Sequence, residues 1–328
     1  MNAITFDNAT TSPSPSSGLN IYAQLSPTFY LCLVIYDAII ALATSLGNFL
    51  LLVVIYRDPL RCLRTPTTSL IANLGVADFF VGAFLGFGRT VEMYFLYKGH
   101  QEPQYLNTFQ YFIGALAMFA AVCSIMAMSW DRFVAVTDPI NYKNRITVKK
   151  VKLYILLIWL NALFLAVLPA AGVRKLDFLF AYCYSHMFVP AIVLTIAYVV
   201  VFKTLSKKLG QFKRRGFTEN PPTETHRNYH HEKKLVFAIF LVLVAFYMCF
   251  APFFVKVHLW FFCSQCDSSP AFLTYHFISN DILSLSALID PLIYACRLQS
   301  FRKTFFRVLG FRRNAINESA LAKQRIIL

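Results

Sequence analysis

The sequence predicts an all-α fold: a seven-transmembrane helix bundle with a short amphipathic eighth helix along the inner membrane surface. Bulk composition indicates a membrane protein, because 57% of the 328 residues are apolar and only 14% are charged. Soluble domains usually hold about 25% charged residues. The placement of those few charges is equally informative, since it leaves long uncharged stretches and gathers lysine and arginine between alternate pairs of them.

The uncharged stretches give the number of spans. A helix needs about 20 apolar residues to cross about 30 Å of hydrocarbon. The candidate spans of about this length cover residues 38–56, 65–88, 103–130, 153–173, 178–202, 235–255 and 271–295. Only Asp78, Asp281 and Asp290 place a charge inside them. Seven membrane helices are therefore expected.

The distribution of basic residues predicts the orientation. With an extracellular N-terminus, only Arg89, Lys98, Arg174, Lys175 and Lys256 of the 31 lysines and arginines lie toward the outside. Basic loops stay cytoplasmic, so a multi-pass protein of the plasma membrane with this orientation is expected. The net charge of +15 then matches an anionic lipid leaflet. A nucleic-acid partner is not expected, because no loop is long enough for a module that reads one.

The chain divides into four parts on this basis. We expect an extracellular tail at 1–28, the seven-helix domain at 29–297, the amphipathic helix at 298–310 and a cytoplasmic tail at 311–328. The first part is rich in Ser, Thr and Pro without a basic start and apolar core, so no cleaved signal peptide is expected. Within it, Asn8 begins a glycosylation triplet, Asn-Ala-Thr.

Two further local patterns predict structure. Cys263 and Cys266, in an external loop, are expected to form a disulfide, because zinc would need a second pair of ligands that the loop lacks. Near the end of the chain, "SFRKTFFRVL" puts apolar residues on one helical face and basic residues on the other. That pattern is typical of a helix lying in the membrane interface.

Polar residues and prolines inside the spans narrow the class, because buried polar groups are expensive in a membrane and normally face the bundle interior. Each helix carries one such residue, the third helix continuing past residue 130 to include Arg132: Asn48, Asp78, Arg132, Trp159, Pro190, Pro252 and Pro291. In this order they resemble the marker residues of the rhodopsin family of G-protein-coupled receptors along nearly the whole chain. The resemblance implies a receptor with no enzymatic activity.

The resemblance also assigns an activation switch. Asp131 and Arg132 are similar to the ionic lock at the cytoplasmic end of helix 3, with Phe133 in place of the commoner tyrosine. Helix 6 would pivot at Pro252, with Phe250 replacing a more frequent tryptophan. The family's other switch residues correspond to Pro291, Tyr198 and Tyr294. Glu232 and His231 both lie near the end of helix 6, and the sequence does not choose between them as the partner of Arg132.

A polar core is the second site that the resemblance implies. Asp78 and Asp290 would face each other, with Asn48 and Ser286 close by. Two buried carboxylates need a cation or a shared proton. Family members commonly hold sodium here, although Ala121 replaces the usual hydroxyl residue. A sodium ion and a protonated acid in a water network both stay open.

The candidate ligand pocket lies in the outer half of the bundle. Its residues are expected to be Asp37, Arg89, Glu92, Tyr111, Gly114, His186, Trp260, Asn280 and Ser284. Retinal is excluded as a cofactor because Ser284 stands where its lysine would be, and a biogenic amine because Gly114 stands where its acid would be. Asp37 and Arg89 each lie about 16 Å outside the marker of their helix, so a salt bridge between them is favoured over a ligand clamp.

The ligand itself stays undefined. Asn107 replaces the helix 3 cysteine of the usual loop disulfide, and the second external loop is very short. These traits resemble the cluster of melanocortin, lysophospholipid, cannabinoid and adenosine receptors, melanocortin most closely. Pro190, Asn107, Tyr111 and Val257 depart from individual members, so no ligand is carried over. An extracellular small molecule, lipid or peptide is expected.

The leading hypothesis is a receptor that activates heterotrimeric G proteins through outward movement of helix 6 and also binds arrestin. A non-signalling seven-helix scaffold or decoy receptor is the first alternative. A transporter or channel is the second, and is disfavoured because the two halves of the chain show no repeat.

Overall fold

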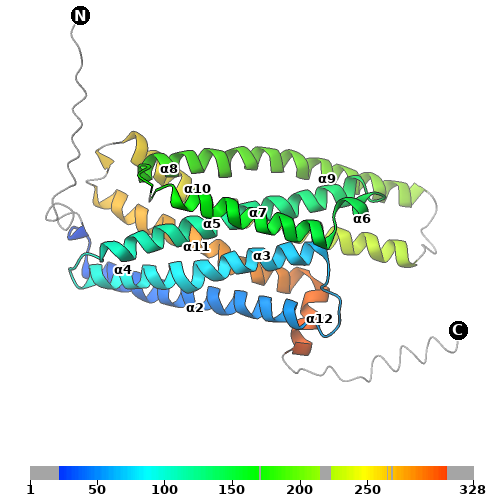
Figure 1. Cartoon of the computed structure of the whole chain (residues 1–328), viewed down its shortest axis with the longest axis horizontal. Helices are drawn as coiled ribbons and strands as arrows, with labels where there is room; N and C mark the ends of the chain where they lie inside the picture. Colours follow the sequence, from blue (N-terminus) through cyan, green and yellow to red (C-terminus); the bar gives the residue numbers. More distant parts are fainter. Residues whose placement is uncertain (1–21, 170, 215–222, 264, 267–268, 309–328) are drawn as a thin grey trace, which may run out of the picture.

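A computed structural model describes residues 22–169, 171–214, 223–263, 265–266 and 269–308. Among them, seven helices are long and apolar enough to cross a membrane, which confirms the predicted bundle. They are Pro27–Arg57, Pro66–Tyr97, Gln104–Thr137, Val148–Val167, Leu176–Lys207, Glu232–Phe262 and Pro270–Arg297. The helices run side by side along the long axis of the molecule (Figure 1).

The helical elements follow the spans in order. The first span is α2 (Pro27–Arg57), and the second is formed by α3 (Pro66–Phe80), η1 (Val81–Gly86) and α4 (Phe87–Tyr97). The third is α5 (Gln104–Thr137). The fourth is α7 (Val148–Val167), which follows the short helix α6 (Tyr142–Arg145). The fifth span is formed by α8 (Lys175–Tyr182), η2 (Cys183–Phe188) and α9 (Val189–Arg214). The sixth is α10 (Thr223–Phe262) and the seventh is α11 (Pro270–Arg297). A final helix, α12 (Gln299–Val308), follows them.

Several helices begin where the sequence supplies a cap. Ser26, Thr65 and Thr147 precede α2, α3 and α7, and each side-chain oxygen accepts a hydrogen bond from the backbone N–H three residues later. Proline follows Ser26 and Thr65 directly, where a missing N–H costs nothing. These short signals fix where the chain enters the bundle.

Two spans contain a π-helical turn that the sequence analysis did not anticipate. The turn η1 interrupts the second span and η2 the fifth, just before Pro190. Such turns insert an extra residue and change which side chains face the bundle beyond them. At η1 the backbones also approach closely, because a Cβ added at Gly82 would lie 2.7 Å from the backbone nitrogen of Ser45 in α2.

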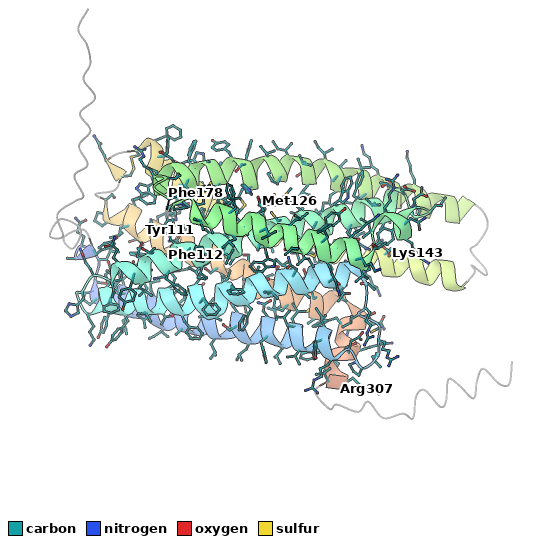
Figure 2. The ribbon with its side chains drawn as sticks, viewed as in Figure 1. Tyr111, Phe112, Met126, Lys143, Phe178 and Arg307 are labelled. Carbon is teal, nitrogen blue, oxygen red and sulfur yellow. A yellow bond between two sulfur atoms is a disulfide. The ribbon has the colours of Figure 1, made fainter. Side chains whose placement is uncertain are left out.

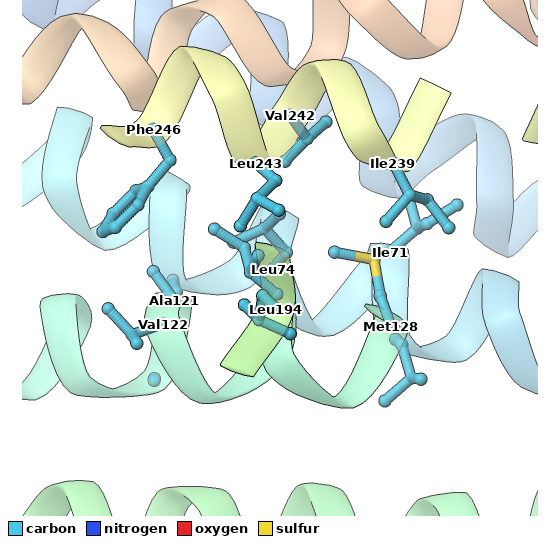
Figure 3. Packing of buried hydrophobic residues seen from close by; sticks show 14 of the residues in the cluster. Ile71, Leu74, Ala121, Val122, Met128, Leu194, Ile239, Val242, Leu243 and Phe246 are labelled. Atoms are coloured by element: carbon cyan, nitrogen blue, oxygen red, sulfur yellow. The ribbon is translucent and has the colours of Figure 1, made fainter. Parts of the chain in front are cut away.

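The apolar core runs along α5 and is closed by α10. Figure 3 shows side chains of α10, among them Ile239, Leu243 and Phe246, facing Ala121 and Met128 of α5. Ile239 and Met128 are fully buried. This layer separates the two ends of the bundle, so a change at one end reaches the other only if these helices shift together.

The ends of the bundle differ in charge. Figure 2 shows Lys143 of α6 and Arg307 of α12 at one end, which we call the basic end, and Tyr111 and Phe178 toward the other. The helix α12 lies across the basic end (Figure 1), with Phe301 buried and its basic side chains exposed. It covers 299–308 of the predicted 298–310, and residues 309–310 lie outside the described part.

Candidate functional site

The basic end of α5 buries the acid and base singled out in the sequence. Asp131 and Arg132 are only 1% and 2% exposed. The guanidinium donates from Nε and Nη2 to Asp131 Oδ2 at 3.1 and 2.7 Å, and from Nη1 to Glu232 Oε2 of α10 at 2.7 Å. Of the two candidate partners on helix 6, the geometry therefore assigns Glu232.

Two residues that sequence reasoning missed complete this network. The Thr67 hydroxyl of α3 donates to Asp131 Oδ2 and accepts from Arg132 Nη2, both at 2.7 Å. The Tyr142 hydroxyl of α6 donates to Asp131 Oδ1 at 2.8 Å. Burial, with Asp131 beside it, raises the pKa of Tyr142 to about 12, so the hydroxyl keeps its proton at neutral pH. We call Asp131, Arg132, Thr67, Tyr142 and Glu232 the lock cluster.

The other predicted switch residues lie deeper and away from Arg132. Tyr198 and Tyr294 are 4% and 1% exposed. The Tyr294 hydroxyl donates to Met128 Sδ at 3.9 Å, and the Tyr198 hydroxyl is buried beside Ser129 of α5. Neither hydroxyl forms a hydrogen bond with the Arg132 guanidinium in the described part of the chain.

Two prolines interrupt the hydrogen-bond ladders of α10 and α11, namely Pro252 and Pro291. A proline inside a helix removes one backbone hydrogen bond and bends the axis. The Tyr275 hydroxyl of α11 donates to the Pro252 carbonyl at 2.8 Å, and Phe250 stacks on Phe246 at 6.2 Å. The flexible point of α10 is thus held from the side by α11.

The polar core brings Asp78, Asp290 and Asn48 together at mid-bundle. The Asn48 amide donates to the carbonyls of Thr44 and Ala287 at 3.0 and 2.9 Å, which ties α2 to α11. Ser286 lines the same cavity as the two acids, and its hydroxyl donates to the Leu283 carbonyl of its own helix at 2.9 Å. Asp78 Oδ2, Asp290 Oδ1 and Asn48 Oδ1 are buried, and the carboxyls of Asp78 and Asp290 face each other closely enough to share a proton. These oxygens fit a hard cation, which prefers oxygen ligands.

A cavity of about 230 Å³, which we call the main cavity, opens between the helices toward the end opposite the basic end. Six predicted ligand-pocket residues line it: Arg89, Glu92, Tyr111, Gly114, Asn280 and Ser284. Aromatic residues form much of its wall, including Phe119, Phe178, Phe246 and Phe253. Asp78 and Asp290 lie at its deep end. The cavity therefore joins the predicted pocket to the polar core.

The predicted Asp37–Arg89 salt bridge is wrong. Arg89 pairs with Glu92 at 3.0 Å and with Asp281 of α11 at 3.1 Å, while Asp37 lines a small pocket together with Arg89 and Asp281 and contacts the Asp281 carboxyl. The height estimate assumed a continuous α-helix from Asp78 to Arg89. The π-helical turn η1 inserts a residue between them, which rotates Arg89 by about 100° around the axis, toward α11. We call Asp37, Arg89, Glu92 and Asp281 the Arg89 cluster.

His186 and Trp260 do not line the main cavity, which corrects two further expectations. His186 lies in η2, edge-on to Phe119 at 4.7 Å and stacked on Tyr182 at 5.7 Å. Its imidazole is therefore behind the aromatic wall. Trp260 packs edge-on against His276 at 5.8 Å, nearer the end of α10. His276, which the sequence analysis did not select, lines the cavity in their place.

The cysteines Cys263 and Cys266 are joined by a disulfide, with their sulfurs 2.03 Å apart. The predicted glycosylation site, Asn8, lies outside the described residues. Within the described part, no three His, Cys, Asp or Glu side chains come together as metal ligands.

The chain is similar in sequence to receptors of two kinds. It is 25% identical to a neuromedin-K receptor of Oryctolagus cuniculus over 334 residues, covering 91% of this chain and 66% of that one. It is also 25% identical to melanocortin receptor 5 of Ovis aries over 280 residues (83% and 82%) and 24% identical to that of Mus musculus over 287 residues (84% of each). The resemblance to melanocortin receptors is confirmed at this distance, although a receptor outside that cluster is as similar.

A solved structure shows the fold of the chain, and a family profile shows its family. Squid rhodopsin superposes with a TM-score of 0.75 over 89% of this chain and 88% of its own, at 16% identity, which shows the shared fold. Residues 47–294 match the profile of the rhodopsin family of 7-transmembrane receptors. That range contains the polar core, the main cavity and all five residues of the lock cluster. The chain belongs to the rhodopsin family of G-protein-coupled receptors.

Proposed function

We propose that this receptor converts the binding of an extracellular ligand in the main cavity into activation of a heterotrimeric G protein, through outward movement of α10. The contact between Arg132 and Glu232 carries this proposal, because it ties α5 to the basic end of α10. Outward movement of α10 separates these two charges. Arg132 then becomes available to a partner that enters from the cytoplasm.

The basic end has room for such a partner. A second cavity of about 250 Å³ lies between α3, α10, α11 and α12, and Thr67 of the lock cluster lines it. Lysine and arginine surround its mouth, including Lys234, Arg297 and Lys303. These charges support a cytoplasmic basic end, an extracellular N-terminus and a place in the plasma membrane. Arrestin would compete for the same face.

The polar core would tune the switch. Asp78, Asp290 and Asn48 present the buried oxygens that would hold a sodium ion, whose positive charge would offset the two carboxylates. Because Asn48 links α2 to α11, closing this core holds α11 against the bundle in the resting arrangement. Movement of α11 would open the core and release that constraint.

The test is ligand-independent guanine-nucleotide exchange, with a panel of G-protein subtypes, by the wild type and Arg132→Ala. Arg174→Ala is the matched control, because Arg174 is an exposed arginine in an ion pair with Asp177 near the opposite end. We expect exchange on at least one subtype for the wild type and the control, and none for Arg132→Ala. Equal exchange by all three proteins would show that Arg132 is not part of the switch, whereas no exchange by any of them at normal surface expression would favour the non-signalling scaffold alternative.

A further inference from the structure

Lys256 of α10 is a buried amine beside the main cavity, with no carboxylate at salt-bridge distance in the described part of the chain. The side chain is 2% exposed and lies one turn beyond Pro252. Its ammonium donates to Asn280 Oδ1 at 2.6 Å and lies 4.0 Å from the centre of the Phe253 ring. Within the described residues, no Asp or Glu comes within salt-bridge distance of it. Burial of an unpaired charge is costly, so this position favours an anionic partner.

Of the two basic residues nearest the cavity, Lys256 is the one without an acidic partner in the described part of the chain. Arg89 also lines the cavity, but Glu92 and Asp281 already engage its guanidinium. The Arg89 charge repels the Lys256 ammonium rather than balancing it. Asp78 and Asp290, at the deep end, are acids and would repel an anion, as would Glu92. An anion is therefore best placed at the wall formed by α10 and α11, beside Asn280 and His276.

The remaining walls of the cavity indicate the chemistry of the part of the ligand that does not pair with Lys256. Asn280 and Phe253, the two contacts of Lys256, both line the cavity, so the ammonium is one side chain away from its interior. The wall around them is largely apolar and aromatic, including Phe119, Phe178 and Phe246. A single cation suits a monoanion, whereas a phosphate would need more donors than this wall supplies.

We propose that the ligand is an apolar or aromatic monocarboxylic acid, whose carboxylate pairs with Lys256 while its body packs against the aromatic wall. On binding, the ligand replaces Asn280 Oδ1 as the acceptor of the ammonium, and the Asn280 amide turns to donate to the same carboxylate. This inference rests on the proposed function, in which the main cavity takes the ligand. Because Lys256 lies on α10 next to Pro252, binding would act directly on the helix that must move.

The test measures binding without a G protein, so its failure can be distinguished from a failure of signalling. Purified receptor in phosphatidylcholine nanodiscs is titrated with two matched series of compounds. The first is decanoic acid, decanol and decylamine. The second is 4-phenylbutyric acid and the alcohol and amine of the same carbon skeleton. The readout is the shift of the thermal unfolding midpoint. We expect the acid of at least one series to bind the wild type more tightly than the alcohol or amine of equal length.

Two variants and a control make the assignment specific. Lys256→Met removes the charge and should weaken acid binding by roughly 10- to 100-fold, the usual effect of losing a charged hydrogen bond. Asn280→Asp gives Lys256 an internal carboxylate and should weaken the acid similarly in a folded receptor. Lys98→Met, at an exposed lysine of the same end, should bind as the wild type does.

The proposal is overturned if neither acid shifts the wild type, or if the alcohol or amine binds as tightly as the acid. It is equally overturned if Lys256→Met and Asn280→Asp retain wild-type affinity for the acid. A folded Asn280→Asp protein that loses acid binding supports the proposal even if Lys256→Met does not fold.

Discussion

The lock cluster and the Arg89 cluster each place a buried arginine among acids at one end of the bundle, but they differ in how completely the charges are paired. Arg132 is paired through Nε, Nη1 and Nη2, with acceptors on α3, α5, α6 and α10. In the Arg89 cluster, Arg89 Nε is buried without a partner in the described structure, and the Asp37 and Asp281 carboxyls contact each other, which requires a proton on one of them. One network is closed and the other is incomplete.

The difference indicates which end of the bundle holds the helices together and which end binds a ligand. A buried polar atom without a partner costs about 1–3 kcal/mol, so an incomplete network gains stability when a ligand, ion or water supplies the missing contacts. A closed network gains nothing from a small ligand and opens only when its helices separate. This comparison supports ligand entry at the Arg89 end and a mechanical switch at the Arg132 end.

The largest effect should come from Asp131→Ala, which breaks the closed network at its centre. Arg132 would lose its nearest counter-charge while 2% exposed, and Tyr142 and Thr67 would lose their acceptor. We expect a loss of about 3–5 kcal/mol in unfolding free energy, together with raised ligand-independent nucleotide exchange. The measurement is thermal unfolding of the purified receptor. A loss below about 1 kcal/mol would show that the network is not closed in solution.

A smaller effect, with the opposite sign, is expected at the incomplete polar core. Asp78→Asn removes one of two facing buried carboxylates, so the variant should be more stable than the wild type in choline chloride, by about 1–3 kcal/mol. It should also lose any stabilisation by sodium chloride over choline chloride. If the wild type is insensitive to sodium, the protonated-acid alternative replaces the sodium ion. If Asp78→Asn destabilises the receptor in both salts, the repulsion argument is wrong.

The smallest effect on stability is expected from Tyr142→Phe, which removes a single hydroxyl from the lock cluster. Asp131 keeps Thr67 and Arg132 as donors, so the loss should be about 1 kcal/mol. Because burial holds the pKa of Tyr142 at about 12, the stability difference from the wild type should be constant from pH 6 to pH 9. A difference that changes across this range would mean that the hydroxyl is already ionised.

The sequence predicted the spans and marker residues well because hydropathy and charge act along the chain. Which side chains meet between helices depends on rotation about the helix axis, and there the sequence was weaker. Arg89 pairs with Asp281 and not with the predicted Asp37 because the π-helical turn η1 rotates the helix beyond it. Such a turn leaves no periodic pattern in the sequence. The relative height of α3, α5 and α10 was needed to find Thr67 and Glu232.

Lys256 shows a different limit. The sequence placed it only as one of five basic residues toward the outer side. Its importance appears when the structure shows that it is buried against Phe253 and Asn280, with no acid within salt-bridge distance among the described residues. A missing counter-charge is a property of the packed bundle, so hydropathy and spacing do not reveal it.

The central claim is that the contact between Arg132 and Glu232 holds α10 closed. Glu232 is 42% exposed, so Glu232→Gln should change unfolding free energy by less than about 1 kcal/mol. An interaction of that size still shifts a two-state equilibrium by about fivefold. Asp177→Asn, at an exposed acid paired with Arg174 near the opposite end, is the matched control.

The most direct measurement is therefore ligand-independent nucleotide exchange by the wild type, Glu232→Gln, Asp177→Asn and the double variant Glu232→Gln/Arg132→Ala at equal surface expression. The account predicts up to about fivefold higher exchange for Glu232→Gln, wild-type exchange for Asp177→Asn, and none for the double variant. Exchange by Glu232→Gln at or below the wild-type rate would contradict it, because the contact would then not restrain α10.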